Sequence, residues 1–130
     1  MNSLTFPYDE TISPALPTLE IEVEGYGANS QRQTLRAIID SGSDGTALPR
    51  PVLLESGSVF RDTVRMRGVT GASQLVDRYL TKVHVAGITI RGVFAVAVSA
   101  EDDALLGRDV LNGLVVILNG PAHVAEIVME

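Results

Sequence analysis

Apolar and polar residues alternate along most of the chain in short runs, which is the pattern of half-buried β-strands. Residues 19–24 (LEIEVE) place apolar side chains between glutamates, so one face of this strand is predicted to be buried. Similar runs predict further strands at 34–40, 59–67, 75–85, 88–98, 114–118 and 124–129. In 88–98 we expect an inner strand whose apolar face is formed by Ile88, Ile90, Phe94, Val96 and Val98.

Helical signals are confined to two short stretches. Residues 107–113 (GRDVLNG) form the only convincing helix, and one turn of helix is expected around 52–55, after two prolines. Many short strands with turn signals between them predict an all-β barrel or sandwich. Residues 1–17 contain three prolines and no sustained periodicity, so we expect an extended N-terminal arm before a single domain at 18–130.

The amino-acid composition excludes several classes of function. The chain has 130 residues, no cysteine and two histidines, which excludes disulfides, thiol nucleophiles and Cys/His zinc sites, and we expect no metal or other cofactor. A net charge of −6 with scattered basic residues argues against a nucleic-acid partner. No basic and apolar leader occurs, and no apolar run reaches the roughly 20 residues that span a bilayer. We therefore expect a soluble, cytoplasmic chain without a membrane segment.

The candidate chemistry lies in residues 36–49 (RAIIDSGSDGTALP), where an apolar strand ends on Asp40. Gly42 allows a tight turn in which its N–H reaches the Asp40 carboxylate, and the Ser41 hydroxyl can lock that turn. Two such carboxylates about 3 Å apart share one proton and can activate a water as a base and an acid. The chain has one Asp-Ser-Gly, so a dyad requires a second copy in a two-fold homodimer.

Three segments in this order resemble the retropepsin-type aspartic proteases, the single-lobed relatives of pepsin. They are residues 38–43 (IIDSGS), the glycine-bearing tip 68–73 (GVTGAS) and residues 104–112 (ALLGRDVLN). The resemblance covers roughly residues 18–130. It implies a retropepsin-like barrel with one short C-terminal helix and a glycine-tipped flap, acting as a homodimeric endopeptidase on peptide or protein substrates. The ending is longer than in the viral enzymes, so a dimer sheet of more than four strands is expected.

The resemblance also implies roles for individual residues. Asp40 would be the catalytic acid and base, Ser41 would form hydrogen bonds across the dimer, and Gly42 would shape the loop and line the cleft. An ion pair between Asp44 and Arg108, beside Gly107, would hold the loop on the helix. The implied substrate-binding positions are Asp44, Ala47, Gly68, Val69, Thr70, Gly71, Ala72 and Leu105. Apolar side chains are expected in the substrate, because the expected cleft lining is Ala37, Ile39, Ala47, Leu48, Val69 and Leu105.

The same residues allow other interpretations. An aspartate after a strand is usually a turn residue, and Ser43 and Thr46 are interpreted as plain turn residues. A calcium loop fails because Gly42 and Pro51 stand at its third and twelfth positions. A haloacid-dehalogenase motif fails because Gly42 replaces the nucleophile. Two alternatives remain: a non-catalytic dimeric peptide-binding module, and an arm at 1–17 that is removed on maturation.

Overall fold

The computed structural model describes residues 2–68 and 70–129, and most of these residues lie in strands. The strands are β1 (Ser3–Pro7), β2 (Thr18–Glu24), β3 (Arg32–Ile39), β4 (Ala47–Pro49), β5 (Val59–Arg67), β6 (Ser73–Val85), β7 (Ile88–Val98), β8 (Leu105–Leu106), β9 (Val115–Asn119) and β10 (Val124–Val128). The helices are α1 (Arg50–Glu55) and α2 (Arg108–Leu111). The prediction of a mostly β protein is confirmed. None of the helices in the described ranges is both long and apolar enough to cross a bilayer.

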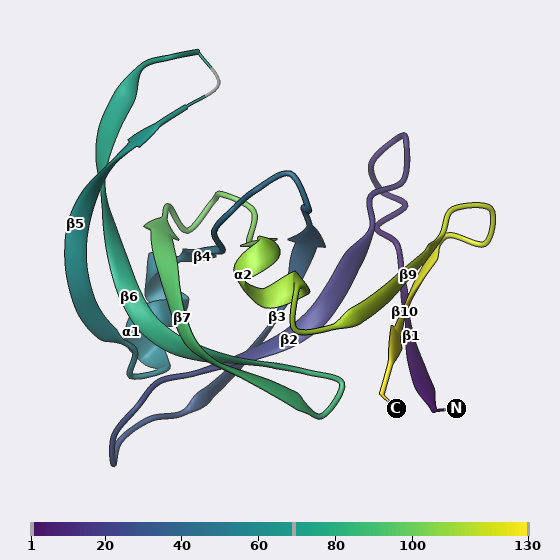
Figure 1. The fold of residues 1–130 in the computed structure, drawn as a ribbon, viewed down its shortest axis with the longest axis horizontal. Helices are drawn as coiled ribbons and strands as arrows, with labels where there is room; N and C mark the ends of the chain where they lie inside the picture. Colours follow the sequence, from purple (N-terminus) through teal and green to yellow (C-terminus); the bar gives the residue numbers. More distant parts are fainter. Residues whose placement is uncertain (1, 69, 130) are drawn as a thin grey trace.

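The strands form two sheets (Figure 1). The larger sheet has the order β2-β3-β8-β4-β7-β6-β5, and β2 also pairs with β6, so the sheet closes on itself. The smaller sheet has the order β1-β10-β9 and brings the two ends of the chain side by side. The outer parts of β5 and β6 project from the body as a long hairpin. Loops 40–46 and 99–104 lie at one end of the closed sheet, near this hairpin.

The core follows from the alternation in β2. Leu19, Ile21 and Val23 are fully buried, whereas the glutamates between them point away from the core. Each buried apolar side chain of this size stabilises the fold by about 1.5–3 kcal/mol relative to exposure. The alternation 19–24 therefore predicted both the strand and its buried face.

Strand β7 contains a bulge that the sequence pattern did not reveal. In its pairing with β6, Thr81 lies opposite Val93 and Val83 lies opposite Ile90, so β7 has one extra residue between these pairs. Gly92 lies in this interval with φ of +71°, a conformation that glycine adopts without strain.

The bulge changes which residues of β7 face the core. Beyond Gly92 the side chains that belong to the core are Val93, Ala95 and Ala97, whereas Phe94 is 39% exposed and Val96, although buried, lines the cleft. The two isoleucines at the start of the strand pack against the core as expected. The expectation that Phe94 shares their buried face was wrong, because one inserted residue reverses the alternation of a strand.

Within the expected N-terminal arm, residues 3–7 form a strand. They pair antiparallel with β10, with Ser3 opposite Val128 and Pro7 opposite Val124. The carbonyl of Pro7 accepts hydrogen bonds from the Arg36 guanidinium at 3.0 Å and the Thr18 hydroxyl at 3.3 Å. The start of the chain is thus attached to both sheets.

Candidate active site

Asp40 lies directly after β3 and is held by backbone contacts on both sides. Its N–H donates to the carbonyl of Leu106 in β8 at 3.0 Å. The N–H of Gly42 donates to the Asp40 carboxylate oxygen Oδ1 at 2.9 Å, so the predicted turn contact is confirmed. A Cβ at position 42 would lie 3.2 Å from this oxygen, which favours glycine. The other oxygen, Oδ2, has no hydrogen-bond partner among the described residues, so the carboxylate is fixed with one side open.

The turn is locked by Ser43 rather than by Ser41. The Ser43 hydroxyl donates to the carbonyl of Gly45 at 2.7 Å, and its N–H donates to the carbonyl of Asp40 at 3.2 Å. The Ser41 hydroxyl has no partner within residues 2–68 and 70–129 and is exposed. The expectation that Ser41 locks the turn within one chain was therefore wrong.

Thr46 joins the Asp40 loop to α2. Its hydroxyl is fully buried, donates to Asp109 Oδ1 at 2.7 Å and accepts the N–H of Gly107 at 3.1 Å. Its own N–H donates to Asp109 Oδ2 at 3.2 Å. The interpretation of Thr46 as a plain turn residue was wrong. A buried hydroxyl without partners would cost about 1–3 kcal/mol, so these contacts both satisfy Thr46 and fix the loop.

The expected ion pair between Asp44 and Arg108 is not present in the described part of the chain. The Arg108 guanidinium instead donates to the carbonyl of Ser41 at 2.8 Å, and the backbone N–H of Arg108 donates to the carbonyl of Ser43 at 2.9 Å. The carboxylate that connects loop and helix belongs to Asp109. The loop is thus held on α2 as expected, but through backbone carbonyls and a neighbouring acid.

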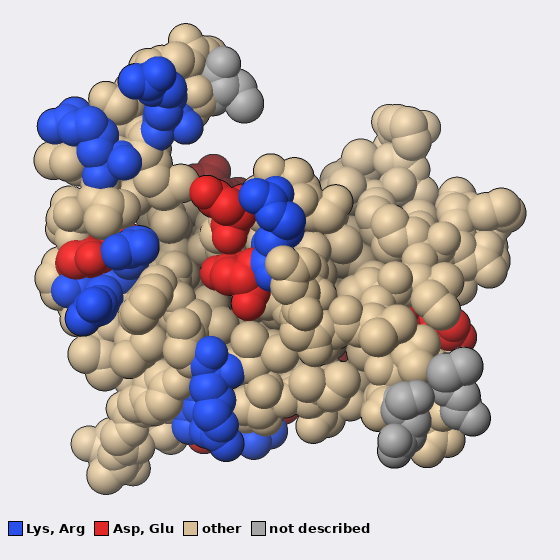
Figure 2. Space-filling model, in the orientation of Figure 1, with Lys and Arg blue, Asp and Glu red and all other residues tan. Residues whose placement is uncertain are grey.

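Two adjoining hollows lie between the β5–β6 hairpin and the body. The large hollow has a volume of about 570 Å³, and the second, which we call the Phe94 hollow, has about 370 Å³. They share Gly45, Met66 and Val96, so they are parts of one cleft. In Figure 2 a group of acidic side chains lies on the body with basic side chains directly beside it, and further basic side chains lie on the hairpin across from this group.

The structure distributes the predicted substrate-binding positions among several places. The large hollow is lined by Ala47, Gly68, Thr70 and Ala72, and the Phe94 hollow by Asp44. Gly71 and Leu105 line neither hollow, and Val69 lies outside the described residues.

Part of the expected apolar lining belongs to the core. Ala37 is 1% exposed and Leu48 is fully buried, so neither can contact a ligand in the cleft. Ile39 is half-buried and lines neither hollow. Met66 and Val96, which were not predicted to contact substrate, supply apolar surface instead.

Ion pairs hold the hairpin in shape and attach it to the body. Arg78 donates through Nε and Nη2 to the two oxygens of Asp62 at 2.8 and 2.7 Å, and these hydrogen bonds lower the pKa of the Asp62 carboxyl. Arg50, at the start of α1, donates to Asp77 and to the Tyr79 hydroxyl, both at 3.1 Å. The base of the hairpin is therefore fixed to α1, while its outer part projects from the body (Figure 1) and lines the cleft.

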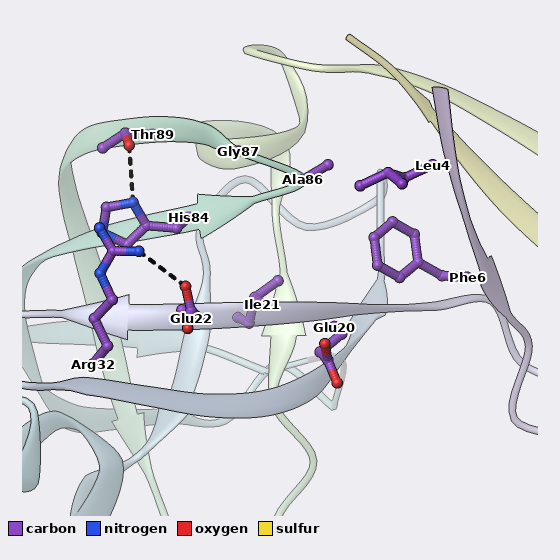
Figure 3. Close-up of a pocket in the computed structure, with 10 residues that line it drawn as sticks. All are labelled: Leu4, Phe6, Glu20, Ile21, Glu22, Arg32, His84, Ala86, Gly87 and Thr89. Carbon is purple, nitrogen blue, oxygen red and sulfur yellow. Dashed lines mark hydrogen bonds and ion pairs between the residues drawn. The ribbon is translucent and has the colours of Figure 1, made fainter. Parts of the chain in front are cut away.

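A third hollow, of about 250 Å³, lies away from Asp40, where β1 approaches β2 (Figure 3). The His84 ring contacts the Thr89 hydroxyl and the Glu24 carboxylate, both at 2.8 Å. Arg32 donates to Glu22 at 3.0 Å. These groups satisfy one another and join four strands, which is a structural role. Across the ranges 2–68 and 70–129, no three His, Asp or Glu side chains gather as a metal site would require.

The family model described as aspartyl protease matches residues 19–110, which include both the Asp40 loop and α2. Several solved structures have a similar fold. The protease of simian foamy virus (mac) is 25% identical, with a TM-score of 0.50 over 70% of this chain and 87% of that chain.

Two further structures share the fold at lower identity. The EIAV protease complexed with the inhibitor HBY-793 is 18% identical, with a TM-score of 0.58 over 75% of this chain and 86% of that one. A retropepsin-like aspartic protease from Rickettsia conorii is 10% identical, with a TM-score of 0.62 over 97% of this chain and 90% of that one. A comparison with curated protein sequences finds no match.

Proposed function

Because the chain belongs to the aspartyl protease family and has a retropepsin-like fold, we propose that it is an endopeptidase that acts as a homodimer. The observation that carries this proposal is the Asp40 carboxylate, which the Gly42 N–H holds at 2.9 Å while Oδ2 stays open. Ser43 and Gly45 of the same loop line the large hollow. The Asp40 carboxylate is thus held in the loop that borders the cleft, where it could act on a peptide bond of a bound substrate.

The proposed chemistry uses Asp40 from each of two copies. Two carboxyls in contact share one proton, because both cannot be ionised at such a distance. The ionised one takes a proton from water, whose oxygen attacks the peptide carbonyl carbon, while the protonated one gives its proton to the carbonyl oxygen. When the C–N bond breaks, the protonated carboxyl gives its proton to the leaving amine, and the other carboxylate takes a proton from a hydroxyl of the tetrahedral intermediate, which becomes the product acid. The dyad again holds one proton. No covalent intermediate forms with the protein.

The smaller sheet supports the proposed dimer. Strand β9 pairs only with β10 within the described residues, so its other edge presents unpaired backbone groups. Val115, Ile117 and Leu118 on this strand are 58%, 44% and 53% exposed. Pairing of β9 with its copy would join two three-stranded sheets into one of six strands, and the Ser41 hydroxyls would then be available for contacts between subunits.

The β5–β6 hairpin would be the flap. An extended peptide would lie between the hairpin and the loop 40–45 and would add a strand through its backbone. Met66 of β5 and Val96 of β7 provide apolar surface on the two sides of this cleft.

The test compares wild-type protein with Asp40→Asn on a library of extended peptides between roughly pH 4 and 7, where a carboxyl dyad changes its protonation. We expect Asp40→Asn to lower kcat/KM by about a hundredfold to ten-thousandfold, the usual contribution of general acid–base catalysis. Glu55→Gln, which neutralises an exposed acid on α1, is the matched control and should cleave like wild type.

A mixing experiment tests the shared dyad. Excess Asp40→Asn protein should lower the activity of wild-type protein after subunit exchange, because a mixed dimer has one carboxylate instead of two.

Equal cleavage by wild-type and Asp40→Asn proteins would overturn the assignment. Peptides bound equally by both proteins and cut by neither would identify a binding module with this fold.

A further inference from the structure

The Phe94 hollow is lined by both apolar side chains and carboxylates. Val64 and Met66 of β5 lie on its hairpin side, and Phe94 and Val96 of β7 lie on its body side. Phe94 reaches this hollow because the bulge at Gly92 turns its ring out of the core. The hollow is large enough for one long side chain, and it opens into the rest of the cleft through shared residues.

Two carboxylates occur in this lining. Asp44 is exposed and has no hydrogen bond or ion pair within the described chain. Asp109 is held in place because its two carboxylate oxygens accept hydrogen bonds from the hydroxyl and the backbone N–H of Thr46. The position of Asp109 is thus fixed before any ligand binds.

The arginine in this lining is already paired with a carboxylate. Arg78 lines the hollow, but its guanidinium makes two short hydrogen bonds to Asp62. Arg78 and Arg61 both stack on the Phe94 ring, with guanidinium carbons 5.5 and 5.2 Å from its centroid. Among the residues that line the hollow, Asp44 and Asp109 outnumber Arg78 by one negative charge. The lining therefore favours a cationic ligand over an acidic one.

We propose that the Phe94 hollow is a subsite that selects a lysine or arginine side chain of the peptide substrate; this inference rests on the proposed function. The methylene groups of the side chain would lie along Val64 and Phe94, and its cationic end would reach the carboxylates of Asp44 and Asp109. Long basic side chains commonly bury their apolar stems while their charge stays at a polar rim.

The position of the selected side chain in the substrate also follows. Asp40, Ser41 and Gly42 do not line the Phe94 hollow, and Asp44 is the first residue of the loop that does. The subsite therefore takes a side chain that is not next to the cleaved bond. The large hollow differs, because its lining contains Arg50 and Arg67 with Asp102.

The test measures selectivity as the ratio of kcat/KM for a lysine-containing peptide to kcat/KM for its norleucine counterpart. Peptides that differ only by lysine or norleucine are compared at each position of one cleaved sequence. We expect wild-type protein to prefer lysine at a single position, outside the two residues of the cleaved bond, by about two- to fivefold in kcat/KM, the size of an exposed ion pair. Asp44→Asn should bring this ratio close to one. Any general loss of binding by this variant affects both peptides and cancels in the ratio.

Asp102→Asn is the matched control, because it removes the same charge from the other hollow. It should leave the lysine-to-norleucine ratio unchanged; an equal fall would show an effect of net charge and overturn the subsite. The same peptide pairs are also titrated against Asp40→Asn protein by fluorescence anisotropy. A ratio near one both for cleavage by wild-type protein and for binding by Asp40→Asn protein would refute the inference even if peptides are cleaved, whereas absent cleavage with retained lysine preference in binding would refute only the proposed enzyme.

Discussion

At the scale of single residues, the distance between the Asp40 loop and α2 depends on Gly107. A Cβ at this position would lie 2.5 Å from the carbonyl carbon of Gly45 and closer still to its carbonyl oxygen. These atoms belong to the backbone, so they cannot move aside as a side chain could. The absence of a side chain at 107 therefore permits the contact through which Thr46 and Asp109 hold the loop.

Gly107→Ala should lower the free energy of unfolding by about 1–3 kcal/mol, the usual cost of adding a methyl group to a close-packed site. It should also lower the proposed peptidase activity by more than the unfolded fraction explains, because the loop that carries Asp40 must shift. Urea unfolding and kcat/KM on one peptide measure the two effects. Gly120→Ala is the control, since a Cβ there meets nothing within 4 Å. Equal stability of both variants would contradict the role of Gly107.

At the scale of secondary-structure elements, the bulge in β7 gives one strand two functions. Before Gly92 its isoleucines pack against the core, and after it Phe94 forms a wall of the cleft. Gly92 has φ of +71°, and a Cβ at this position would meet nothing within 4 Å. The backbone conformation alone, rather than crowding, therefore disfavours other residues here.

Substitutions at Gly92 should rank by their tolerance of positive φ. Gly92→Asn should cost less free energy of unfolding than Gly92→Val, with about 1–2 kcal/mol lost for the β-branched residue. Thermal or urea unfolding of the two variants measures the difference, and the open space around the position keeps packing out of the comparison. The reverse order would mean that the bulge is not maintained in solution.

The sequence predicted the longer strands and the last two, β9 and β10, but not β1, β4 or β8. The bounds of β5 and β7 were predicted correctly because apolar runs and turn residues mark them, whereas β8 has two residues and no periodicity to detect. The turn at Asp40 was predicted because its partners, the Asp40 carboxylate and the Gly42 N–H, are two residues apart in the sequence. Thr46 and Asp109 are 63 residues apart, so no local pattern connects them. The bulge had a single signal, Gly92, and one glycine in a strand does not establish a bulge.

At the scale of the whole molecule, the ion pairs make stability depend on pH. The pKa of the Glu24 carboxyl lies below its ordinary value of 4.5, mainly because His84 donates a hydrogen bond to it. Burial acts in the opposite direction, and the positive charges of Lys82 and Arg32 lower the pKa further. A carboxyl whose pKa is lowered by folding stabilises the protein above its unfolded pKa. That contribution is lost as the pH falls through the folded pKa.

Glu24→Gln should therefore be less stable than wild type at pH 7, and the difference should shrink as the pH falls below about 4.5. Urea midpoints at pH 7, 5 and 3.5 give the comparison. Glu55→Gln serves as control and should follow the wild-type curve, because Glu55 is exposed and forms no ion pair within the described chain. A difference between Glu24→Gln and wild type that does not change with pH would show that the carboxylate charge is not the cause.

The pairing of the first strand with the last has a mechanical consequence. Ser3 lies opposite Val128, so both ends of the chain leave the smaller sheet at the same end of an antiparallel pair. A force that separates the two ends would load the hydrogen bonds between β1 and β10 one after another, instead of all together as in a shearing pull. Tension would thus peel β1 from the smaller sheet before it reached the closed sheet that holds Asp40.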